Sequence, residues 1–295
     1  MKRPRHTQNN LRYLSQIFST AFIKKIVEKE KADLFISKVS NHFKLKITNN
    51  TTNKEIIKKT YNQLSKYYRC EYIYKNSLIN YIIDHYSTKN TSVFDEFSIA
   101  SSKADLTLLN GDFKIFEIKT ELDDFSRLPS QIADYQKVAN KVNIVTTKKN
   151  INKLLEEYTN SSVGILYLTE KNTIIEAKPA NINTDFFEFD ALFKLLRKSE
   201  YITLTNKFFN TIPDVPNTRI FEECYNLLSK INILEFQKET IELLKLRNKK
   251  NLTLLEQSKI PNELIYVCNA INMNEKKYNT LKNFLNQKHH VSTIS

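Results

Sequence analysis

Residues 101–135 read "SSKADLTLLNGDFKIFEIKTELDDFSRLPSQIADY", and this stretch decides the fold of the chain. Its apolar residues predict two strands, and the Asn110-Gly111 pair between them is the strongest short-range signal of a β-hairpin. Glu117 and Lys119 lie two residues apart on the second strand, so both side chains point to one face of the sheet. A buried strand face excludes charged groups unless they are paired or bind a metal. The face therefore predicts a site that needs a carboxylate beside an ammonium group.

Strand and helix patterns alternate on both sides of this hairpin. The predicted strands cover residues 93–100, 104–109, 113–120, 142–147, 164–169 and 173–178, and the predicted helices cover residues 71–86, 126–141 and 151–158. The order helix, three strands, helix, strand indicates an α/β domain with a mixed central sheet flanked by helices.

The rest of the chain has helical spacing. Apolar residues recur every three or four positions from Leu11 to Phe43, and a second helix is expected from a cap at Thr52 or Asn53 toward Tyr68. Helical patterns return after residue 183. We therefore expect three segments: a basic helical N-terminal segment (1–64), the α/β core (65–183) and a helical C-terminal segment (184–295).

The positive charge of the chain is concentrated near its start. The formal net charge is +13, and residues 1–60 hold 14 Lys or Arg against 4 Asp or Glu, whereas residues 61–183 hold 15 of each. A basic segment beside a neutral core predicts a polyanionic partner, with nucleic acid as the first candidate. The candidate contacts are Lys24, Lys25, Lys29 and Lys31. The alternative is that these lysines only solvate the surface of a helix.

Composition excludes several other classes of protein. No run of about 18 apolar residues occurs, and no apolar stretch follows the basic start, so we expect a soluble cytoplasmic protein without a membrane span. Three widely spaced cysteines argue against a cysteine-based zinc site. Two glycines are too few for a Walker loop or a dinucleotide-binding fingerprint.

A second carboxylate is expected beside Glu117. Asp105 lies on the strand that the hairpin pairs with the strand of Glu117, so the two side chains can approach each other. Two carboxylates repel unless a cation lies between them, and hard oxygen ligands suit Mg²⁺, with Mn²⁺ as a substitute. Lys119 beside such a metal can donate a hydrogen bond to an attacking water molecule or to a phosphate. Without a metal, we expect removal of either acid to leave the fold intact or to stabilise it slightly.

The arrangement of Asp105 followed by Glu117-Ile118-Lys119 resembles the active site of the PD-(D/E)XK nuclease superfamily, with Ala104 in the place of the proline. Gln131 and Tyr135 match the Q-x-x-x-Y motif of the branch that resembles RecB and lambda exonuclease. The run from residue 117 to 135 is also similar to a group of uncharacterised small bacterial nuclease-like proteins. The resemblance covers roughly residues 65–180.

This resemblance implies a restriction-endonuclease-like core of order αβββαβ and a Mg²⁺-dependent phosphodiesterase acting on nucleic acid, with DNA as the expected substrate. It implies the following roles: Asp105 and Glu117 bind metal, Lys119 activates water, Glu71 supplies an extra acid with Glu96 as its rival, and Gln131 orients Lys119 or a phosphate. Arg127 is either a phosphate contact or a surface charge, and Tyr135 either contacts the substrate or packs in the core.

Two alternatives remain open at the level of sequence. The chain could be a nucleic-acid-binding protein on a nuclease-derived scaffold that does not cut, or a phage-related interaction protein whose helical segments bind a protein partner. The intact set of Asp105, Glu117 and Lys119 favours the nuclease over both.

Overall fold

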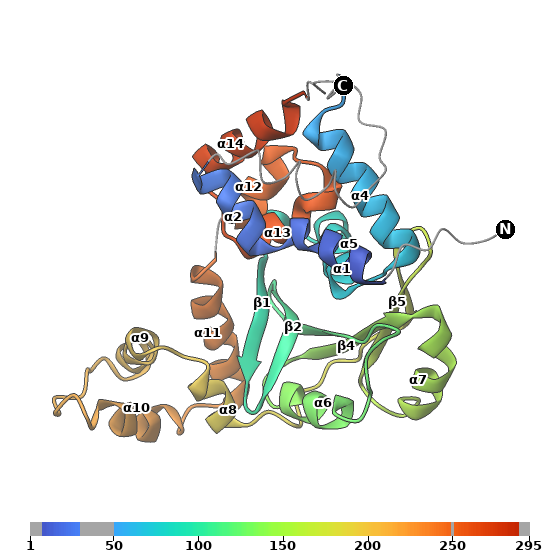
Figure 1. The fold of residues 1–295 in the computed structure, drawn as a ribbon. Coiled ribbons are helices and arrows are strands. Elements are labelled where there is room, and N and C mark those ends of the chain that lie inside the picture. The colour runs from blue at the N-terminus through green and yellow to red at the C-terminus, as the bar shows by residue number, and fades with distance from the viewer. Residues whose placement is uncertain (1–7, 30–49, 249–250, 289–295) are drawn as a thin grey trace. The chain divides into compact units, whose positions relative to one another are not determined.

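The computed structural model describes residues 8–29, 50–248 and 251–288 of the 295-residue chain, and the chain divides into two compact units (Figure 1). The helical unit takes in residues 1–88, 168–174 and 250–295, and the sheet unit takes in residues 89–167 and 175–249. This division differs from the segments 1–64, 65–183 and 184–295 expected from sequence. The helix that begins at Glu71 groups with the N-terminal helices, and the C-terminal helices are shared between the two units.

The sheet unit contains a six-stranded sheet whose order follows the chain, β1-β2-β3-β4-β5-β6. Strands β1, β2 and β3 are antiparallel, whereas β4 runs parallel to β3, so the sheet is mixed. The bounds of the strands are β1 Ser92–Ile99, β2 Ser102–Leu109, β3 Phe113–Ile118, β4 Lys141–Thr147, β5 Gly164–Leu168 and β6 Ile174–Lys178. The turn between β5 and β6 groups with the helical unit.

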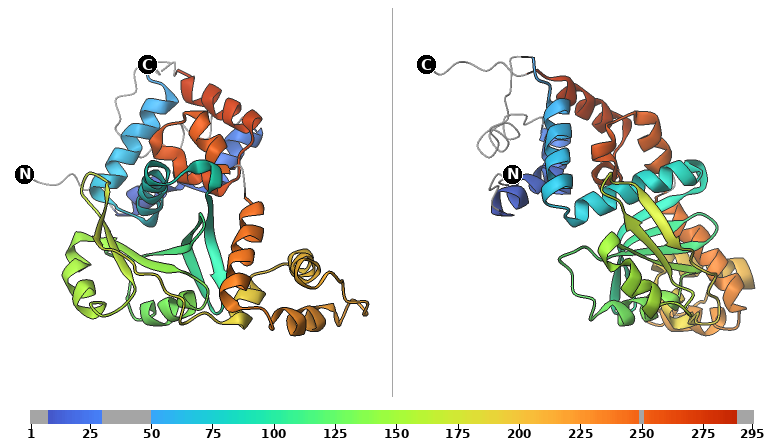
Figure 2. Two further views of the ribbon diagram at one scale, coloured as in Figure 1. Left: turned by 180° about the vertical axis from the view of Figure 1, so that it is seen from behind. Right: turned by 90° about the vertical axis from the view of Figure 1, so that its right-hand side faces the viewer.

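Helices flank this sheet, so the α/β class predicted from the sequence is confirmed. Helix α6 connects β3 to β4 and packs against β2 and β4, while α11 packs against β2. The helices of the sheet unit are α6 Leu128–Gln136, α7 Ile151–Glu157, α8 Phe189–Lys194, α9 Lys198–Phe209, α10 Ile220–Leu228 and α11 Ile233–Leu246. Figure 2 shows them from two further sides.

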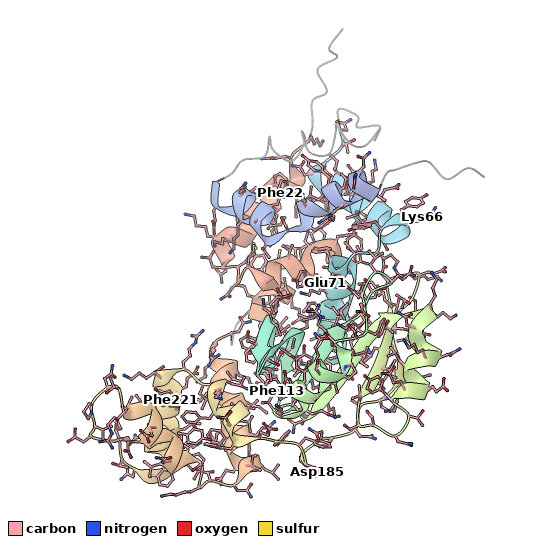
Figure 3. All side chains as sticks on the ribbon, turned by 60° about the horizontal axis from the view of Figure 1, so that its bottom comes forward. Phe22, Lys66, Glu71, Phe113, Asp185 and Phe221 are labelled. Carbon is pink, nitrogen blue, oxygen red and sulfur yellow. The ribbon has the colours of Figure 1, made fainter. Side chains whose placement is uncertain are left out.

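The core of the sheet unit joins strand and helix side chains that are far apart in sequence. Phe113 and Ile115 of β3 pack in one cluster with Tyr135 of α6, Leu192 of α8 and Phe236 of α11, and all five are fully buried. Phe113 is labelled among the packed side chains in Figure 3. The strand β3 is buried at every position, which places any charged residue on it inside the protein.

The predicted hairpin between β2 and β3 is confirmed. Leu106 pairs with Phe116 and Leu109 with Phe113 across the antiparallel ladder. Gly111 in the turn has φ +104°, a conformation that residues with a Cβ rarely adopt. This register continues to Asp105 and Glu117 as the next opposite positions.

Helix α6 is shorter than the helix predicted over residues 126–141. Pro129 lies in its first turn, as the sequence indicates, but the helix ends at Gln136. The reason is tertiary: Asn140 leaves the helix, and its side-chain oxygen accepts a hydrogen bond of 2.8 Å from the backbone amide of Phe113. That contact ties the end of the connection to the start of β3.

The helical unit contains α1 Gln8–Ser15, α2 Thr20–Lys29, α4 Asn53–Tyr67, α5 Glu71–His85, α12 Asn251–Ser258, α13 Ile265–Ala270 and α14 Glu275–Asn286. The expected cap of α4 is Thr52, whose hydroxyl accepts from the Glu55 amide while the Glu55 carboxylate accepts from the Thr52 amide. The helix expected from Leu11 to Phe43 is broken, because Ser19 is extended and caps α2. Residues 30–43 of that prediction lie outside the described residues. Among the helices that the structure describes, none is long and apolar enough to cross a membrane.

Candidate active site

Glu117 on β3 and Lys119 directly after β3 are both buried, and they pair with each other. Glu117 is 2% exposed and Lys119 is 7% exposed. The Lys119 Nζ atom lies 2.9 Å from Oε1 of Glu117, so the ammonium and the carboxylate form an ion pair inside the sheet unit. The backbone oxygen of Lys119 accepts a hydrogen bond of 2.8 Å from the Thr146 hydroxyl, which fixes the end of β3 against β4. The structure thus brings together the two groups that the sequence placed on one strand face.

Helix α6 holds both members of this pair. Gln131 accepts a hydrogen bond from Nζ of Lys119 at 2.9 Å through its Oε1 atom, and the Tyr135 hydroxyl donates to Oε2 of Glu117 at 2.7 Å. Gln131 and Tyr135 are four residues apart, so the two side chains leave the same face of α6. The hydrogen bond from Lys119 to Gln131 is the contact through which Gln131 could orient the Lys119 ammonium group. Tyr135 is fully buried, and its hydroxyl holds the Glu117 carboxylate.

Asp105 lies beside this group on the neighbouring strand β2. It is the position opposite Glu117 when the β2–β3 register is continued by one residue. Its Oδ2 atom accepts a hydrogen bond of 2.7 Å from the backbone amide of Ile118. Burial raises the pKa of Tyr135 far above its ordinary value, and the negative charges of Glu117 and Asp105 raise it further. Both carboxylates therefore act on the same buried hydroxyl.

Glu96 adds a third carboxylate within the sheet unit. A carboxylate oxygen of Glu96 lies within 4.8 Å of one of Asp105. The β1–β2 ladder pairs regularly on both sides of Glu96, but Glu96 itself has φ +53° and interrupts it. The Glu96 carboxylate also forms an ion pair with Lys103 at 2.9 Å. The rival that the sequence offered for the extra acid thus lies close to Asp105.

Glu71, the other candidate for the extra acid, is the first residue of α5 and belongs to the helical unit. Its side chain is exposed and lies 2.7 Å from Nζ of the buried Lys75. Because Asp105 belongs to the sheet unit, a shared role of Glu71 and Asp105 stays a prediction.

The remaining predicted substrate contacts lie on surfaces or outside the described chain. Arg127 is exposed and directly precedes α6. Lys24 and Lys25 are exposed on α2, and Lys29 is the last residue of that helix. Lys31 lies outside the described residues.

The donor set of the site suits a hard divalent cation. Asp105 and Glu96 offer carboxylate oxygens that lie within 4.8 Å of each other, and carboxylate oxygens are ligands that Mg²⁺ and Mn²⁺ prefer. Each oxygen of Glu117 receives one hydrogen bond, and a carboxylate has about four lone-pair directions, so capacity for a cation remains. The chemistry of these carboxylates is compatible with a hard divalent cation.

Sequence reasoning missed the role of Asp134, between Gln131 and Tyr135 on α6. Its Oδ2 atom accepts hydrogen bonds from the hydroxyls of Ser101 and Ser102 at 2.6 and 2.8 Å. These hydrogen bonds connect α6 to the turn between β1 and β2, and so help to fix the helix that carries Gln131 and Tyr135. The sequence shows Ser101, Ser102 and Asp134 as three short polar residues, but only the tertiary structure shows that they contact one another.

Comparison with known proteins adds the family. Residues 64–268 match the family described as Bacteriophage P4 protein cII. The curated "Protein cII" of Enterobacteria phage P4 is 27% identical over 167 residues, which cover 55% of this chain and 62% of that protein, so the match spans less than two thirds of its length. A solved structure, the SPO1766 protein of unknown function from Silicibacter pomeroyi, shares 15% identity at a TM-score of 0.30, covering 37% of this chain and 70% of that chain. A likeness that weak supports no conclusion about the fold.

The family match takes in more than two thirds of the chain and contains the whole sheet with the residues Asp105, Glu117, Lys119, Gln131 and Tyr135. The chain therefore belongs to the Bacteriophage P4 protein cII family.

Proposed function

We propose that this protein is a Mg²⁺-dependent nuclease that hydrolyses phosphodiester bonds in nucleic acid, with DNA as its substrate. The observation that carries the proposal is the buried Glu117–Lys119 pair, held by Gln131 and Tyr135 beside Asp105. Burying two charges is costly, and an isolated structural pair is no more stabilising than two apolar residues of similar volume. A buried charged pair that costs free energy without stabilising the fold is expected at a functional site.

The order β1, β2, β3, α6, β4 within the sheet unit, preceded along the chain by α5 of the helical unit, is the order of the PD-(D/E)XK superfamily that the motif resembles. We propose on this basis that the sheet unit has a restriction-endonuclease-like core. The Q-x-x-x-Y motif supports it, because both of its named side chains bond to the Glu117–Lys119 pair.

The proposed reaction forms a bond between a water oxygen and phosphorus and breaks the bond from phosphorus to the leaving oxygen, which takes up a proton. A bound Mg²⁺ would lower the pKa of water and stabilise negative charge on the phosphate. Asp105 and Glu117 would hold it through their carboxylates. Lys119 has three N–H donors and spends two on Glu117 and Gln131, so the third can hold the attacking water or a phosphate oxygen.

The extra acid is proposed to come from Glu96 or Glu71. Glu96 is supported by its distance to Asp105 within the sheet unit, and Glu71 is supported by the resemblance. Calorimetric titration of Mg²⁺ into Glu96→Gln and Glu71→Gln distinguishes them, because the variant that loses a ligand binds the ion more weakly. Glu235→Gln on α11, an exposed acid, serves as the control.

We propose that nucleic acid is bound through exposed cations, which include Lys24 and Lys25 on α2 and Arg127 before α6. Further parts of this proposal are a protein partner for the helical segments and a cytoplasmic location. The location rests on the composition of the chain, and the protein partner rests on the helical segments that flank the sheet.

The test is incubation with circular and linear DNA, single- and double-stranded, and with RNA, in Mg²⁺, Mn²⁺, Ca²⁺ or EDTA. We expect cleavage in Mg²⁺ and Mn²⁺, poor cleavage in Ca²⁺ and none in EDTA. Glu117→Gln keeps an oxygen that can accept from Lys119 and should abolish cleavage, whereas Glu235→Gln should not change it. Cleavage by Glu117→Gln at the wild-type rate would exclude this site.

A second candidate is a nucleic-acid-binding protein of the same fold that does not cut. The observation that favours it is that both oxygens of Glu117 already accept hydrogen bonds from the protein. Metal-independent binding of DNA without cleavage under any of the conditions above would select it.

A further inference from the structure

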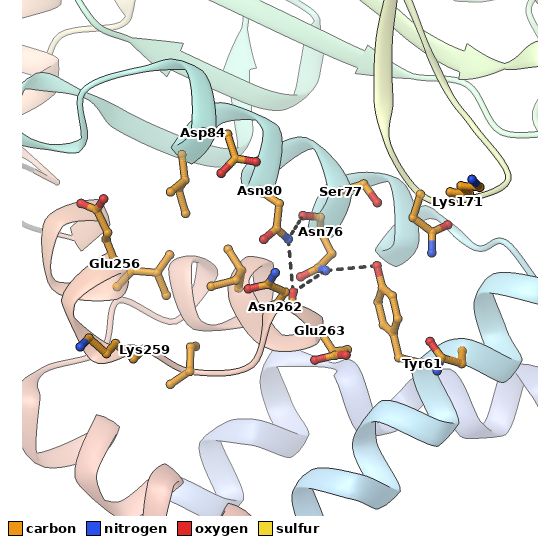
Figure 4. Close-up of a pocket in the computed structure, with 16 residues that line it drawn as sticks. Tyr61, Asn76, Ser77, Asn80, Asp84, Lys171, Glu256, Lys259, Asn262 and Glu263 are labelled. Carbon is orange, nitrogen blue, oxygen red and sulfur yellow. Dashed lines mark hydrogen bonds between the residues drawn. The ribbon is translucent and has the colours of Figure 1, made fainter.

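A pocket of about 420 Å³ lies wholly within the helical unit, whereas the Glu117–Lys119 pair belongs to the sheet unit. Helices α4 and α5, the turn between β5 and β6, and the segment from α12 to α13 line it (Figure 4). The volume is in the range of pockets that bind small molecules. Aliphatic side chains of Ile83, Leu255, Ile260 and Ile265 alternate with polar and charged groups in the lining.

One hydrogen-bond acceptor in the pocket is held in a fixed orientation. The Nδ2 atom of Asn80 donates to the backbone oxygens of Asn76 at 2.8 Å and Asn262 at 3.2 Å. These two bonds use the donor end of the amide and leave Oδ1 as an acceptor. Asp84 lies four residues later on α5, so its carboxylate lies on the same helix face (Figure 4). The α5 wall therefore offers two acceptors, Oδ1 of Asn80 and the Asp84 carboxylate, together with the Ser77 hydroxyl, which has no hydrogen-bond partner among the described residues.

The charged groups of the pocket do not neutralise each other. The Glu256 carboxylate accepts a hydrogen bond from the Thr88 hydroxyl, and the other four charged groups of the lining are the carboxylates of Asp84 and Glu263 and the ammonium groups of Lys171 and Lys259. Among the residues that the structure describes, none of these four side chains has an ion-pair partner within 4.0 Å. A ligand with N–H donors at one place and a negative charge at another would match both sets.

We propose that this pocket binds a guanine nucleotide. The Watson–Crick edge of guanine carries N1–H and an exocyclic amino group side by side, which can donate to the Asp84 carboxylate and to Oδ1 of Asn80. The phosphate can pair with Lys171 or Lys259, and the aliphatic side chains can cover the faces of the ring. The base is recognised by side chains of α5, and the two lysines lie in turns, which agrees with a chain whose two glycines are too few for a phosphate-cradling loop.

Adenine provides the matched comparison. Its N1 atom is an acceptor, so the Asp84 carboxylate would face a lone pair instead of an N–H group. A pocket with unpaired acceptors discriminates strongly against such a base, because the acceptors are desolvated without a partner. Inosine monophosphate keeps N1–H but lacks the amino group, and lies between the two.

The test is isothermal titration of the full chain with GMP, IMP and AMP in EDTA, so that it is independent of the nuclease proposal. We expect GMP to bind best, IMP about tenfold more weakly and AMP more weakly still. Asp84→Asn should lower the GMP affinity about tenfold and remove the preference over AMP, whereas the exposed Asp214→Asn in the sheet unit should have no effect. Equal affinities for GMP and AMP, or no binding of either at millimolar concentration, would overturn the proposal.

The lysines and the source of the guanine are tested in two further arms. Lys171→Gln with Lys259→Gln should reduce GMP affinity to that of guanosine, whereas Lys230→Gln with Lys238→Gln, two exposed lysines of the sheet unit, should not. An unchanged GMP affinity in the first pair would overturn the phosphate contact. Single-stranded dT₅ and the same strand with one central guanine distinguish an unpaired base from a free nucleotide. Tighter binding of the guanine strand than of GMP, lost in Asp84→Asn, would identify the guanine as part of nucleic acid.

Discussion

At the scale of single residues, Glu117 and Lys119 stabilise each other inside the sheet unit. The sequence predicted that removing an active-site acid would be neutral or slightly stabilising. The contacts change that expectation for Glu117, because its loss leaves the buried Lys119 ammonium without its carboxylate. Breaking one side of a buried pair costs about 3–5 kcal/mol, whereas replacing both partners by apolar residues costs much less.

We therefore expect Glu117→Leu to lower the free energy of unfolding by about 3 kcal/mol or more. The double variant Glu117→Leu with Lys119→Met should recover most of that loss, and neither variant should cleave DNA. Urea unfolding measures the stability, and the matched control is Glu235→Leu on the surface of α11. A single variant as stable as the wild type would show that Lys119 finds another partner or reaches water.

Tyr135 gives a prediction with a pH dependence. Its hydroxyl donates to the buried Glu117, so Tyr135→Phe should cost about 1–3 kcal/mol at pH 8. The folded pKa of Tyr135 lies far above the value of roughly 10 in the unfolded chain. Above a pH of roughly 10, Tyr135 loses its proton in the unfolded state but keeps it in the folded state. The contribution of Tyr135 to the free energy of unfolding therefore falls by about 1.4 kcal/mol per pH unit.

The stability difference between wild type and Tyr135→Phe should thus be full below pH 10 and shrink above it. Urea unfolding at pH 8 and pH 11 measures it. Tyr167→Phe on β5 is the control, because Tyr167 is partly exposed and its replacement should give a small difference at pH 8. A Tyr135 difference that is constant over this range would contradict the buried, protonated hydroxyl.

At the scale of elements, the turn between β2 and β3 determines which residue faces Glu117. Gly111 has φ +104°, and a Cβ added there would meet nothing within 4 Å. The cost of Gly111→Ala is therefore backbone strain without a clash, and we expect about 1–3 kcal/mol. Gly111→Asn should cost less, because asparagine tolerates positive φ better than alanine. Urea unfolding of both variants tests this, and equal losses would mean that the turn changes its conformation to accept either residue.

The position of helix α6 on the sheet determines what its side chains contact. Gln131 and Tyr135 leave the same helix face by spacing alone, but they reach Lys119 and Glu117 only because α6 is fixed against the sheet. Asp134 provides that fixation through Ser101 and Ser102. The positions of the charged pair and of the helix thus depend on each other.

At the scale of the whole molecule, the excess charge of residues 1–60 is the source we propose for attraction to DNA. Replacing Lys24, Lys25, Lys29 and Lys31 by Gln should weaken binding similarly for all sequences. Each lost phosphate contact should flatten the log–log dependence of affinity on salt by about 0.9. Filter binding of the metal-free protein at several salt concentrations measures the slope.

The control pair for this experiment is Lys24→Gln with Lys25→Gln against Lys230→Gln with Lys238→Gln, since all four lysines are exposed and described. The first pair should flatten the slope and the second should not. Identical slopes in wild type and in the four-lysine variant would mean that the N-terminal charge only solvates the surface.

The sequence by itself determined the features that depend on neighbours along the chain. The hairpin at Asn110-Gly111, a helix cap at Thr52 or Asn53, and the shared face of Gln131 and Tyr135 follow from backbone preference and from the two periods of strand and helix. The mixed α/β class followed from the same periods in order.

Only the tertiary structure decided the features that join distant segments. Helix α6 ends at Gln136 because Asn140 binds the start of β3, and the turn between β5 and β6 groups with the helical unit. Two further features join distant segments. One is the hydrogen bond from Tyr135 to Glu117, and the other is the pocket that α5 shares with the segment from α12 to α13. A hydrophobic period shows which face of an element is buried, but it does not name the partner, because that choice depends on packing between residues far apart in the chain.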